Sequence, residues 1–456
     1  MRHTLIAATA LLMLAAAPPG PATPAESRAP RIWLAPSADG SWRVRYELGE
    51  PATSLGFTRA HSNWRVKRWT PVDELKLLHD GDGTRAQRVD GAPFREAAFD
   101  TPARYQHVPK DYAPFSPFSD GGLLIHTGQF HACAAGAPCP GDAAWPLSIT
   151  PPMGAHSIVQ GAVHTGAVDI RSSGSGTNVY VGSARPLEAS HFIAVIDAGL
   201  PAEVKDALHR LLPPLMDHFT GLLGPLPEKP MLFASLDPHP PKGSGYNSQG
   251  GTLPNQIFIH LYGEKWAKGA GEQVGGRLPW FFAHEAAHLF QSAGVADDYT
   301  MEQSWIHEGG ADAFAALTIA KLGGASDEYV NGRIKRALDE CGSGLKTLDG
   351  KPLNASGETG AFENYYACGL LMQLAIDAEL RRASEGKQDL FDLWSAYLGR
   401  LRAGAPTNQD TFLGVAGEMG ARGAAAFARA LATVPQRDPK AFIRSELAKA
   451  GLALAD

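Results

Sequence analysis

The stretch L-P-W-F-F-A-H-E-A-A-H-L, from Leu278 to Leu289, is the part of the sequence from which the rest is interpreted. Pro279 suits the first turn of a helix, where its missing N–H costs nothing. On that helix His284 and His288 are four residues apart and lie on one face. Two imidazoles at this spacing can bind one Zn²⁺, and Glu285 can reach a metal-bound water as a general base. On the order of one random chain in a hundred of this length would contain the pattern, so a third ligand is needed to support it.

A second stretch supplies that candidate ligand. It reads W-I-H-E-G-G-A-D-A-F-A-A-L, from Trp305 to Leu317, and also favours a helix. Nineteen residues separate His288 from Glu308, enough for a connection and a return helix antiparallel to the first. Glu308 would complete a site of two His and one Glu with a fourth position open, which is the catalytic rather than the structural arrangement of zinc.

Asp312 lies four residues after Glu308, on the same helix face. A carboxylate there could accept the second N–H of a ligating His and fix its tautomer. The alternative is a solvated helix position, but the neighbouring Ala and Phe residues favour a buried helix. We therefore expect Asp312 to orient a His ligand. His307 adjoins Glu308 but points to another face, so we do not expect it to be a ligand.

These two segments resemble the gluzincin metallopeptidases. H-E-A-A-H followed by W-I-H-E-G-G-A is most similar to the M1 aminopeptidase and M61 glycyl-aminopeptidase type, in which a W-x-x-E-G segment supplies the Glu ligand. The spacing from His288 to Glu308 is one residue longer than in M1 enzymes and equals that of the thermolysin-like branch. The resemblance implies one Zn²⁺ as cofactor and a peptide or protein as substrate.

The same resemblance points to a tyrosine further along the chain. In M1-type enzymes a Y-x-x-G sequence at the head of a helix supplies a Tyr that stabilises the oxyanion. The stretch E-N-Y-Y-A-C-G-L-L-M-Q-L, from Glu363 to Leu374, contains this pattern at Tyr366 and Gly369. A tetrahedral intermediate develops negative charge, which a positioned O–H donor stabilises. Tyr366 is therefore the candidate donor; the neighbouring Tyr365 and an ordinary core Tyr are the alternatives.

One segment departs from the M1 pattern. By position, G-S-G-Y-N-S-Q-G-G-T-L-P-N, from Gly243 to Asn255, matches the M1 segment that holds a substrate's free amino group through a Glu, and it contains no Glu. Its many Gly residues predict a mobile loop. The departure leaves peptide hydrolysis intact and favours an endopeptidase as the alternative to an aminopeptidase.

The start of the chain is typical of a secretory signal peptide. Arg2 and His3 precede a short apolar run that small residues follow. The run is too short to span a bilayer, and no later stretch is long and apolar enough to do so. We expect cleavage at Ala25 and an exported protein, either periplasmic or secreted.

Composition and charge limit the remaining possibilities. Without the predicted signal peptide about 430 of the 456 residues remain, too many for one compact core and suited to two or three domains. The formal net charge of −6, without a long basic run, argues against nucleic acid as a partner. Four Cys in an exported protein fit two disulfides. The simplest of the three connectivities pairs Cys133 with Cys139 and Cys341 with Cys368; the alternative is free buried thiols.

The first part of the chain is predicted to be rich in β-strands. Short alternating or β-branched runs, separated by Gly, Pro and Asp turns, occur at 42–48, 156–164 and 178–182. R-V-K-R-W, from Arg65 to Trp69, is interpreted as the polar face of a strand. Five histidines in this part lack a partner at ligand spacing and are expected to be structural or surface residues: His107, His126, His131, His156 and His164.

An α/β segment follows. Strands are predicted at 192–197, 230–237 and 256–262, and an amphipathic helix at 201–223 that Pro213 and Pro214 interrupt. The rest of the chain is predicted to be helical. The organisation is thus a signal peptide (1–25), a β-rich N-terminal domain (26–188), an α/β lobe (189–277) and a helical lobe with the zinc site (278–456). The fold class is multidomain α+β, and the resemblance implies that the last two segments form a thermolysin-like catalytic domain.

Together with the resemblance, these residues predict an exported zinc-dependent peptidase of the M1/M61-like aminopeptidase type, in which Glu285 activates a zinc-bound water. One alternative is a zinc endopeptidase without an anchor for the substrate's amino terminus. Another is a catalytically silent, zinc-bearing binding protein, which would have no need of a general base at Glu285. No pattern in the sequence indicates an oligomeric state.

Overall fold

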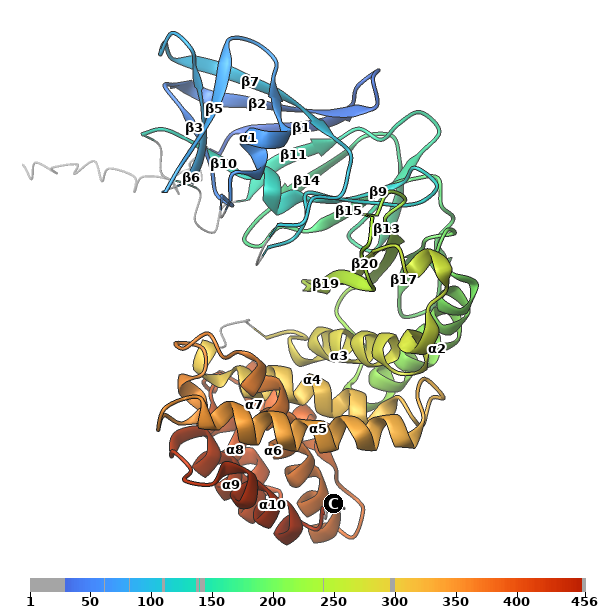
Figure 1. Ribbon diagram of the computed structural model, residues 1–456, viewed down its shortest axis with the longest axis vertical. Helices are drawn as coiled ribbons and strands as arrows, with labels where there is room; N and C mark the ends of the chain where they lie inside the picture. Colours follow the sequence, from blue (N-terminus) through green and yellow to red (C-terminus); the bar gives the residue numbers. More distant parts are fainter. Residues whose placement is uncertain are drawn as a thin grey trace, which may run out of the picture.

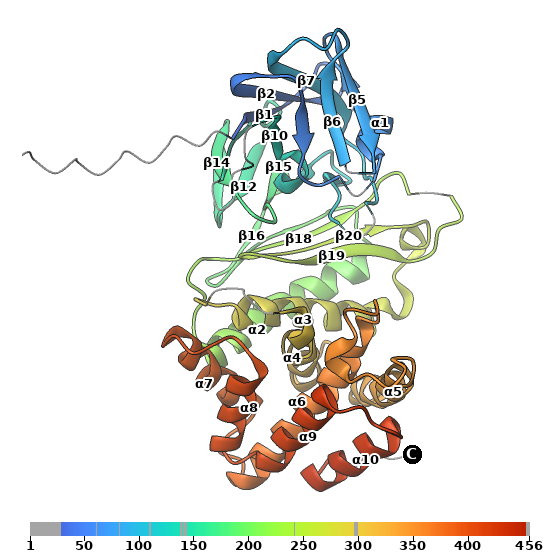
Figure 2. The same ribbon diagram turned by 90° about the vertical axis from the view of Figure 1, so that its left-hand side faces the viewer.

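Figure 1 shows the computed structural model of the protein. It describes residues 29–452 apart from 61, 82, 109–110, 137–138, 140–143, 241 and 296–299. A β-rich part lies at one end of the molecule and a helical part at the other, with a smaller sheet between them (Figures 1 and 2). The signal peptide predicted at 1–25 lies outside the described residues.

The N-terminal part contains three β-sheets. The six-stranded sheet has the order β14 (Val168–Ser172), β11 (Trp145–Ile149), β1 (Arg31–Pro36), β2 (Ser41–Ala52), β7 (Phe94–Pro102) and β4 (Thr70–Pro71). The four-stranded sheet has the order β10 (Ala132–Ala134), β3 (Leu55–Phe57), β6 (Gly83–Arg88) and β5 (Leu75–Asp80). The five-stranded sheet has the order β13 (Ala162–Thr165), β12 (His156–Val159), β15 (Asn178–Gly182), β9 (Leu123–His126) and β8 (Phe115–Pro117).

Strand β2 shows why this part folds as sheets. Its side chains alternate between buried and exposed from Trp42 to Leu48, so one face of the strand faces the core and the other faces solvent.

The segment from Arg65 to Trp69, interpreted as the polar face of a strand, is instead mostly a short helix, α1 (Trp64–Arg68), so that prediction was wrong. Arg65 is fully buried there, with its guanidinium over the Trp64 ring and bonded to the carbonyl of Gln129. Its aromatic and carbonyl partners offset the cost of burying the charge, which a count of charged residues cannot reveal.

The middle part is a five-stranded sheet with the order β16 (Leu187–Glu188), β17 (Ile193–Ile196), β18 (Met231–Leu236), β20 (Gln256–Tyr262) and β19 (Asn247–Leu253). Strands β17, β18 and β20 are parallel, and β19 is antiparallel to β20 at the edge. In β18, Leu232 and Ala234 pack into the helical core, whereas Met231 and Phe233 pack against apolar residues of the N-terminal sheets. Both faces of this sheet are therefore buried, which explains its nearly continuous apolar strands.

Two details of this part differ from expectation. The Gly-rich segment predicted as a mobile loop forms strand β19, because Gly250 and Gly251 let it lie close to its neighbours: a Cβ on Gly250 would stand 2.5 Å from the Phe258 carbonyl oxygen. Helix α2 (Ala202–Leu223) runs through Pro213 and Pro214 without ending. Its buried apolar side, which includes Leu211 and Leu215, packs into the helical core and holds the helix despite the lost N–H donors.

The C-terminal part is helical. Its α-helices are α3 (Arg277–Gln291), α4 (Ser304–Thr318), α5 (Asp327–Lys346), α6 (Glu363–Ala383), α7 (Leu390–Arg402), α8 (Gln409–Glu418), α9 (Arg422–Thr433) and α10 (Pro439–Ala450). Side chains of Ser326, Asp389, Asn408 and Asp438 cap four of these helices at their N-termini. None of the helices in the described ranges is long and apolar enough to span a membrane.

Two disulfides are present, in the local pairing expected from the sequence. Cys133 and Cys139 close a short loop in the N-terminal part. Cys341 of α5 is bonded to Cys368 of α6, across a sequence separation of 27 residues. Both Cys341 and Cys368 are fully buried. The second bridge therefore ties together two helices of the helical core.

We predict that the α5–α6 disulfide stabilises the protein more than the short one. Chain entropy gives about 3–4 kcal/mol for a loop of this length and about 2 kcal/mol for the loop at Cys133. Replacing Cys341 and Cys368 together by Ala should lower the melting temperature further than replacing Cys133 and Cys139 together. Differential scanning calorimetry of the two double variants tests this, and an equal or smaller loss for the α5–α6 pair would contradict it.

Candidate metal centre

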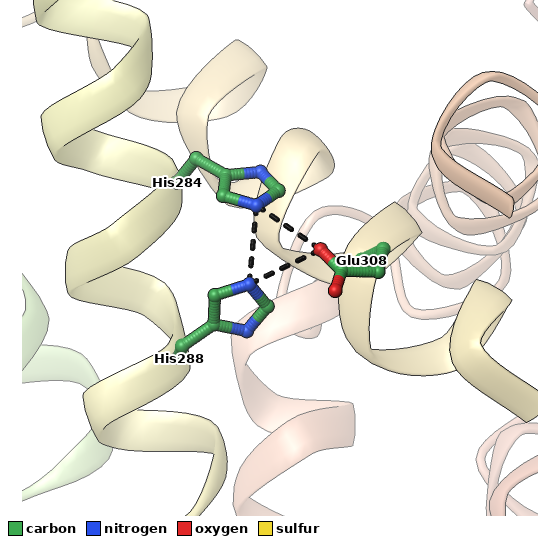
Figure 3. A group of neighbouring side chains, drawn as sticks. All are labelled: His284, His288 and Glu308. Carbon is green, nitrogen blue, oxygen red and sulfur yellow. Dashed lines mark hydrogen bonds and ion pairs between the residues drawn. The ribbon is translucent and has the colours of Figure 1, made fainter. Parts of the chain in front are cut away.

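Helix α3 presents two imidazoles to one point. His284 and His288 lie one turn apart, and their Nε2 atoms are 3.1 Å apart. His284 is buried, and His288 is partly buried on the same face. Figure 3 shows both rings directed toward helix α4.

Helix α4 brings Glu308 to the same point. Its Oε2 lies 3.2 Å from His284 Nε2 and 3.3 Å from His288 Nε2 (Figure 3). A tetrahedral Zn²⁺ with bonds of ~2.0–2.2 Å separates its ligand atoms by roughly 3.3–3.5 Å, which is close to these three distances. Within the part of the chain that the structure describes, these residues are the group of three whose ligand atoms could hold one metal ion.

The chemistry of the group also fits a cation. Glu308 Oε2 is buried and makes no hydrogen bond of proper geometry in the described part of the molecule, although two ring nitrogens are close to it. Burial alone would raise the pKa of Glu308, but His288 and His284 outweigh it and hold the pKa well below its usual value. A carboxylate kept ionised beside two imidazole nitrogens is a donor set that a divalent cation requires.

The Nδ1 nitrogen of each ring, on the side away from the centre of the group, is within hydrogen-bond distance of a neighbouring side chain. His284 Nδ1 is 2.9 Å from Asp312 Oδ1, and because a carboxylate only accepts, the ring donates this hydrogen bond. His288 Nδ1 is 2.9 Å from Gln291 Oε1, whose amide nitrogen donates to the His307 carbonyl. When a ring is neutral its proton is therefore on Nδ1, and its Nε2 lone pair faces the centre of the group.

Asp312 and Gln291 are both buried, at 4 % and 0 % exposure. The Trp280 indole N–H donates to Asp312 at 2.6 Å, so the carboxylate is fixed on α4 from two sides. The position of Asp312 agrees with its expected role of orienting a His. Sequence reasoning did not single out Gln291, although it lies three residues after His288 on the same helix.

Glu285 faces the same cavity from α3 and is bonded to strand β19. The Thr252 hydroxyl lies 2.7 Å from Glu285 Oε2 and 2.9 Å from its carbonyl oxygen. Glu285 is not among the three clustered ligand groups. A partly exposed carboxylate on this wall can accept a proton from a water molecule in the cavity.

Tyr366 of α6 also lines this cavity. Its ring is nearly parallel to that of His284, with centroids 5.7 Å apart. Burial raises the pKa of Tyr366, and the charges of Glu308 and Glu285 raise it further, so the hydroxyl stays protonated and can donate. The neighbouring Tyr365 is buried, and its hydroxyl donates to the Asn354 carbonyl, so it packs away from the cavity.

The approach of α4 to α6 depends on two glycines. A Cβ on Gly309 would lie 2.3 Å from the Cα of Gly369, and a Cβ on Gly369 would lie 2.4 Å from the Trp305 carbonyl oxygen. No side chain fits between the helices at this crossing. The Gly of the Y-x-x-G pattern, Gly369, is thus explained by helix packing, and this packing brings Tyr366 within reach of the metal-binding group.

A cavity of about 860 Å³ connects these groups. His284, Glu285, His288, Glu308 and Tyr366 all line it, so the structure brings these five sequence-predicted residues together. His307 also lines it, and burial lowers its pKa to about 3, so it is a neutral ring outside the metal-binding group.

Other parts of the chain contribute walls of the cavity, and one of them belongs to the segment 243–255 that the M1 resemblance placed at the substrate site. Strand β19 supplies the edge from Gly250 to Leu253. The N-terminal part supplies Arg59, Tyr112 and Ser175. No spacing pattern connects these residues to the metal-binding helices, because they are more than a hundred residues away in sequence.

Comparisons with known proteins agree with the fold. No protein-family model matches the chain, and no curated protein matches it in sequence. Among solved structures, it is similar to an aminopeptidase N family protein from Idiomarina loihiensis, with a TM-score of 0.59 and 13 % identity over 84 % of this chain and 72 % of that one. An M1 zinc metallopeptidase from Deinococcus radiodurans gives a TM-score of 0.47 and 15 % identity over 89 % of this chain and 93 % of that one, a likeness too weak to argue from. The first likeness shows that the chain shares the fold of that aminopeptidase N family protein, and at this identity it shows the fold alone.

We predict that Asp312 sets the affinity of the centre for Zn²⁺. Asp312→Asn should weaken zinc binding by roughly 10- to 100-fold, because the ring of His284 loses the carboxylate that orients it. Competition with a chromophoric chelator measures the affinity, and Asp206→Asn, at an exposed position on α2, is the matched control. Equal affinity in the two variants would show that Asp312 does not support the ligand.

We also predict that any side chain at position 369, where α4 crosses α6, destabilises the protein. Gly369→Ala should destabilise the protein by about 1–3 kcal/mol, because the methyl group forces the helices apart. Gly399 of α7 is exposed, and a Cβ added there would have no neighbour within 4 Å, so Gly399→Ala should be neutral or stabilise by roughly 0.5–1 kcal/mol. Denaturant unfolding of both variants checks the contrast; matching midpoints would rule out the close contact.

Proposed function

We propose that this chain is a zinc-dependent peptidase. The observation that carries the proposal is the triangle of ligand atoms from His284, His288 and Glu308, with spacings of 3.1–3.3 Å, on the wall of a cavity that Glu285 and Tyr366 also line. Two imidazoles and one carboxylate leave a position open to substrate, as in catalytic rather than structural zinc sites. The M1-type fold supports the proposal independently.

When bound, a zinc ion would polarise the scissile carbonyl and lower the pKa of a water molecule to about 7. The chain's own residues would do the rest. Glu285 accepts the proton of the attacking water and delivers it to the leaving amine. The Thr252 hydroxyl fixes the side chain of Glu285 against β19, which keeps the base in one orientation. The Tyr366 hydroxyl donates to the oxyanion of the tetrahedral intermediate.

The resemblance to M1 and M61 enzymes favours an aminopeptidase, and one observation favours an endopeptidase instead. The wall formed by β19 presents Gly250, Gly251, Thr252 and Leu253, none of which carries a negative charge. A free ammonium group on a substrate would find no carboxylate on this strand. The proposal therefore keeps a zinc endopeptidase as the alternative to an aminopeptidase. It also includes a thermolysin-like catalytic lobe.

Export also belongs to the proposal. The apolar stretch after Arg2 and the two disulfides are both typical of a protein that folds outside the cytoplasm. A catalytically silent zinc-binding protein fits less well, because Glu285 and Tyr366 face the cavity without serving as ligands.

We predict Glu285-dependent cleavage of peptides. A mixed peptide library, half of it N-acetylated, should be cleaved by the zinc-loaded protein, and Glu285→Gln should reduce the rate by roughly 10²- to 10⁴-fold while zinc content stays the same. Mass spectrometry of the products gives the cleavage positions, and Glu272→Gln, at an exposed site, is the control.

The products separate the candidates. Loss of single residues from free amino termini alone indicates an aminopeptidase, and internal cleavage that ignores acetylation indicates an endopeptidase. If the protein cleaves nothing in a Glu285-dependent way, the peptidase proposal fails and the silent binding protein takes its place.

A further inference from the structure

Tyr112 belongs to the N-terminal part, yet its side chain lines the metal-centre cavity. The ring makes edge-to-face contacts with Phe258 of β20 and His126 of β9, with centroids 4.9 and 5.2 Å away. A Cβ on Gly251 would lie 3.0 Å from the Tyr112 hydroxyl oxygen, so this hydroxyl rests directly on strand β19. A side chain at position 251 would displace it.

The backbone around Tyr112 is held on every side. The Gln249 side chain of β19 donates to the Asp111 carbonyl at 2.8 Å and accepts from the Ala113 N–H at 3.2 Å. The Gln129 side chain donates to the Tyr112 carbonyl at 2.7 Å. The two bonds of Gln249 join the N-terminal part to the edge of the middle sheet, and all three bonds fix the backbone that carries Tyr112.

A partly buried ion pair fixes the same segment. The Asp111 carboxylate accepts from the Tyr112 N–H at 2.8 Å and pairs with Arg59, whose guanidinium also donates to the Ser175 carbonyl at 2.7 Å. Asp111 and Arg59 therefore neutralise each other, and Arg59 is occupied within the protein. This segment therefore contributes the Tyr112 hydroxyl to the cavity lining but no net charge.

The hydroxyl of Tyr112 makes no hydrogen bond with any of the described residues, whereas its N–H and its carbonyl both do. Burial raises the pKa of Tyr112 to about 12, with smaller contributions from Glu285 and from Asp111 and a counteracting one from Arg59. It is thus a neutral donor at neutral pH. Such a group, rigidly placed and unpaired in a cavity, suits a carbonyl acceptor on a ligand.

We propose that Tyr112 is a positioning residue for the peptide main chain: its hydroxyl donates to a substrate carbonyl that lies along β19, away from the bond that is cut. This inference rests on the proposed peptidase function. It makes the N-terminal part a wall of the substrate site. Because the donor is neutral, it serves a peptide with a blocked amino terminus as well as a free one.

The test compares Tyr112→Phe with the wild type on a free peptide from the cleaved library and, where the wild type cleaves it, on the N-acetylated form. Loss of one hydrogen bond to a neutral acceptor should raise KM roughly 3- to 10-fold for each cleaved peptide and leave kcat unchanged, because the bond forms before and during the reaction. Tyr246→Phe is the matched control, since the Tyr246 hydroxyl donates to the Gly269 carbonyl outside the cavity lining.

A binding measurement removes the dependence on turnover. Calorimetric titration of the acetylated peptide into Glu285→Gln and into Glu285→Gln with Tyr112→Phe should show the same 3- to 10-fold weakening. The peptide stays intact in both proteins, so a change in Kd reports contact with the substrate.

Several results would overturn the inference while leaving the peptidase standing. They are an unchanged KM and Kd in the Tyr112→Phe proteins, an effect confined to free peptides, or a fall in kcat alone, which would place Tyr112 in the chemical step. Absence of Glu285-dependent cleavage by the wild type would overturn both the function and the inference.

Discussion

The half-buried Glu308 side chain, whose Oε2 atom is itself buried, is the group around which the metal-binding helices are arranged. Its Oε2 lies 3.2 and 3.3 Å from two imidazole nitrogens, and a buried charge costs several kcal/mol unless such partners hold it. Helix α4 reaches this position by packing backbone to backbone against α6 at Gly309 and Gly369. The same crossing sets the distance of Tyr366 from His284, so one close helix contact fixes both Glu308 and the tyrosine that we propose as the oxyanion donor.

Buried amide side chains close to the metal-binding residues form hydrogen bonds between helices in an otherwise apolar core. Gln291 bonds both the ring of His288 and the His307 carbonyl, and Gln373 of α6 donates to the Ile306 carbonyl while accepting from Trp394. Because each of these buried amides is paired at both ends, it ties neighbouring helices together at little cost. A ligand set supported in this way is held ready before any cation binds, which is what a catalytic site requires.

The sequence predicted the residues whose positions follow from helix geometry. A spacing of four residues puts His284 over His288 and Asp312 over Glu308, so the metal-binding face could be inferred without a structure. The Tyr366 assignment needed the family resemblance, because no spacing relates it to the ligands. Strand β19 was missed because its glycines predict a loop, whereas tertiary packing against Phe258 and Tyr112 selects them for a strand. Arg65 was missed for a related reason: its burial depends on partners distant in sequence.

Strand β19 is where the three parts of the molecule meet. Thr252 bonds to Glu285 of the helical part, and Gln249 bonds the segment that carries Tyr112. The strand therefore lies between the N-terminal part and helix α3, which carries Glu285 (Figure 2). The groups that would carry out the chemistry all lie on α3, α4 and α6, but the surfaces that a substrate would contact come from all three parts. Substrate recognition can consequently change through substitutions in the β-rich part while the metal-binding helices stay the same. A sequence motif that is confined to those helices therefore identifies the chemistry and leaves specificity to the rest of the chain.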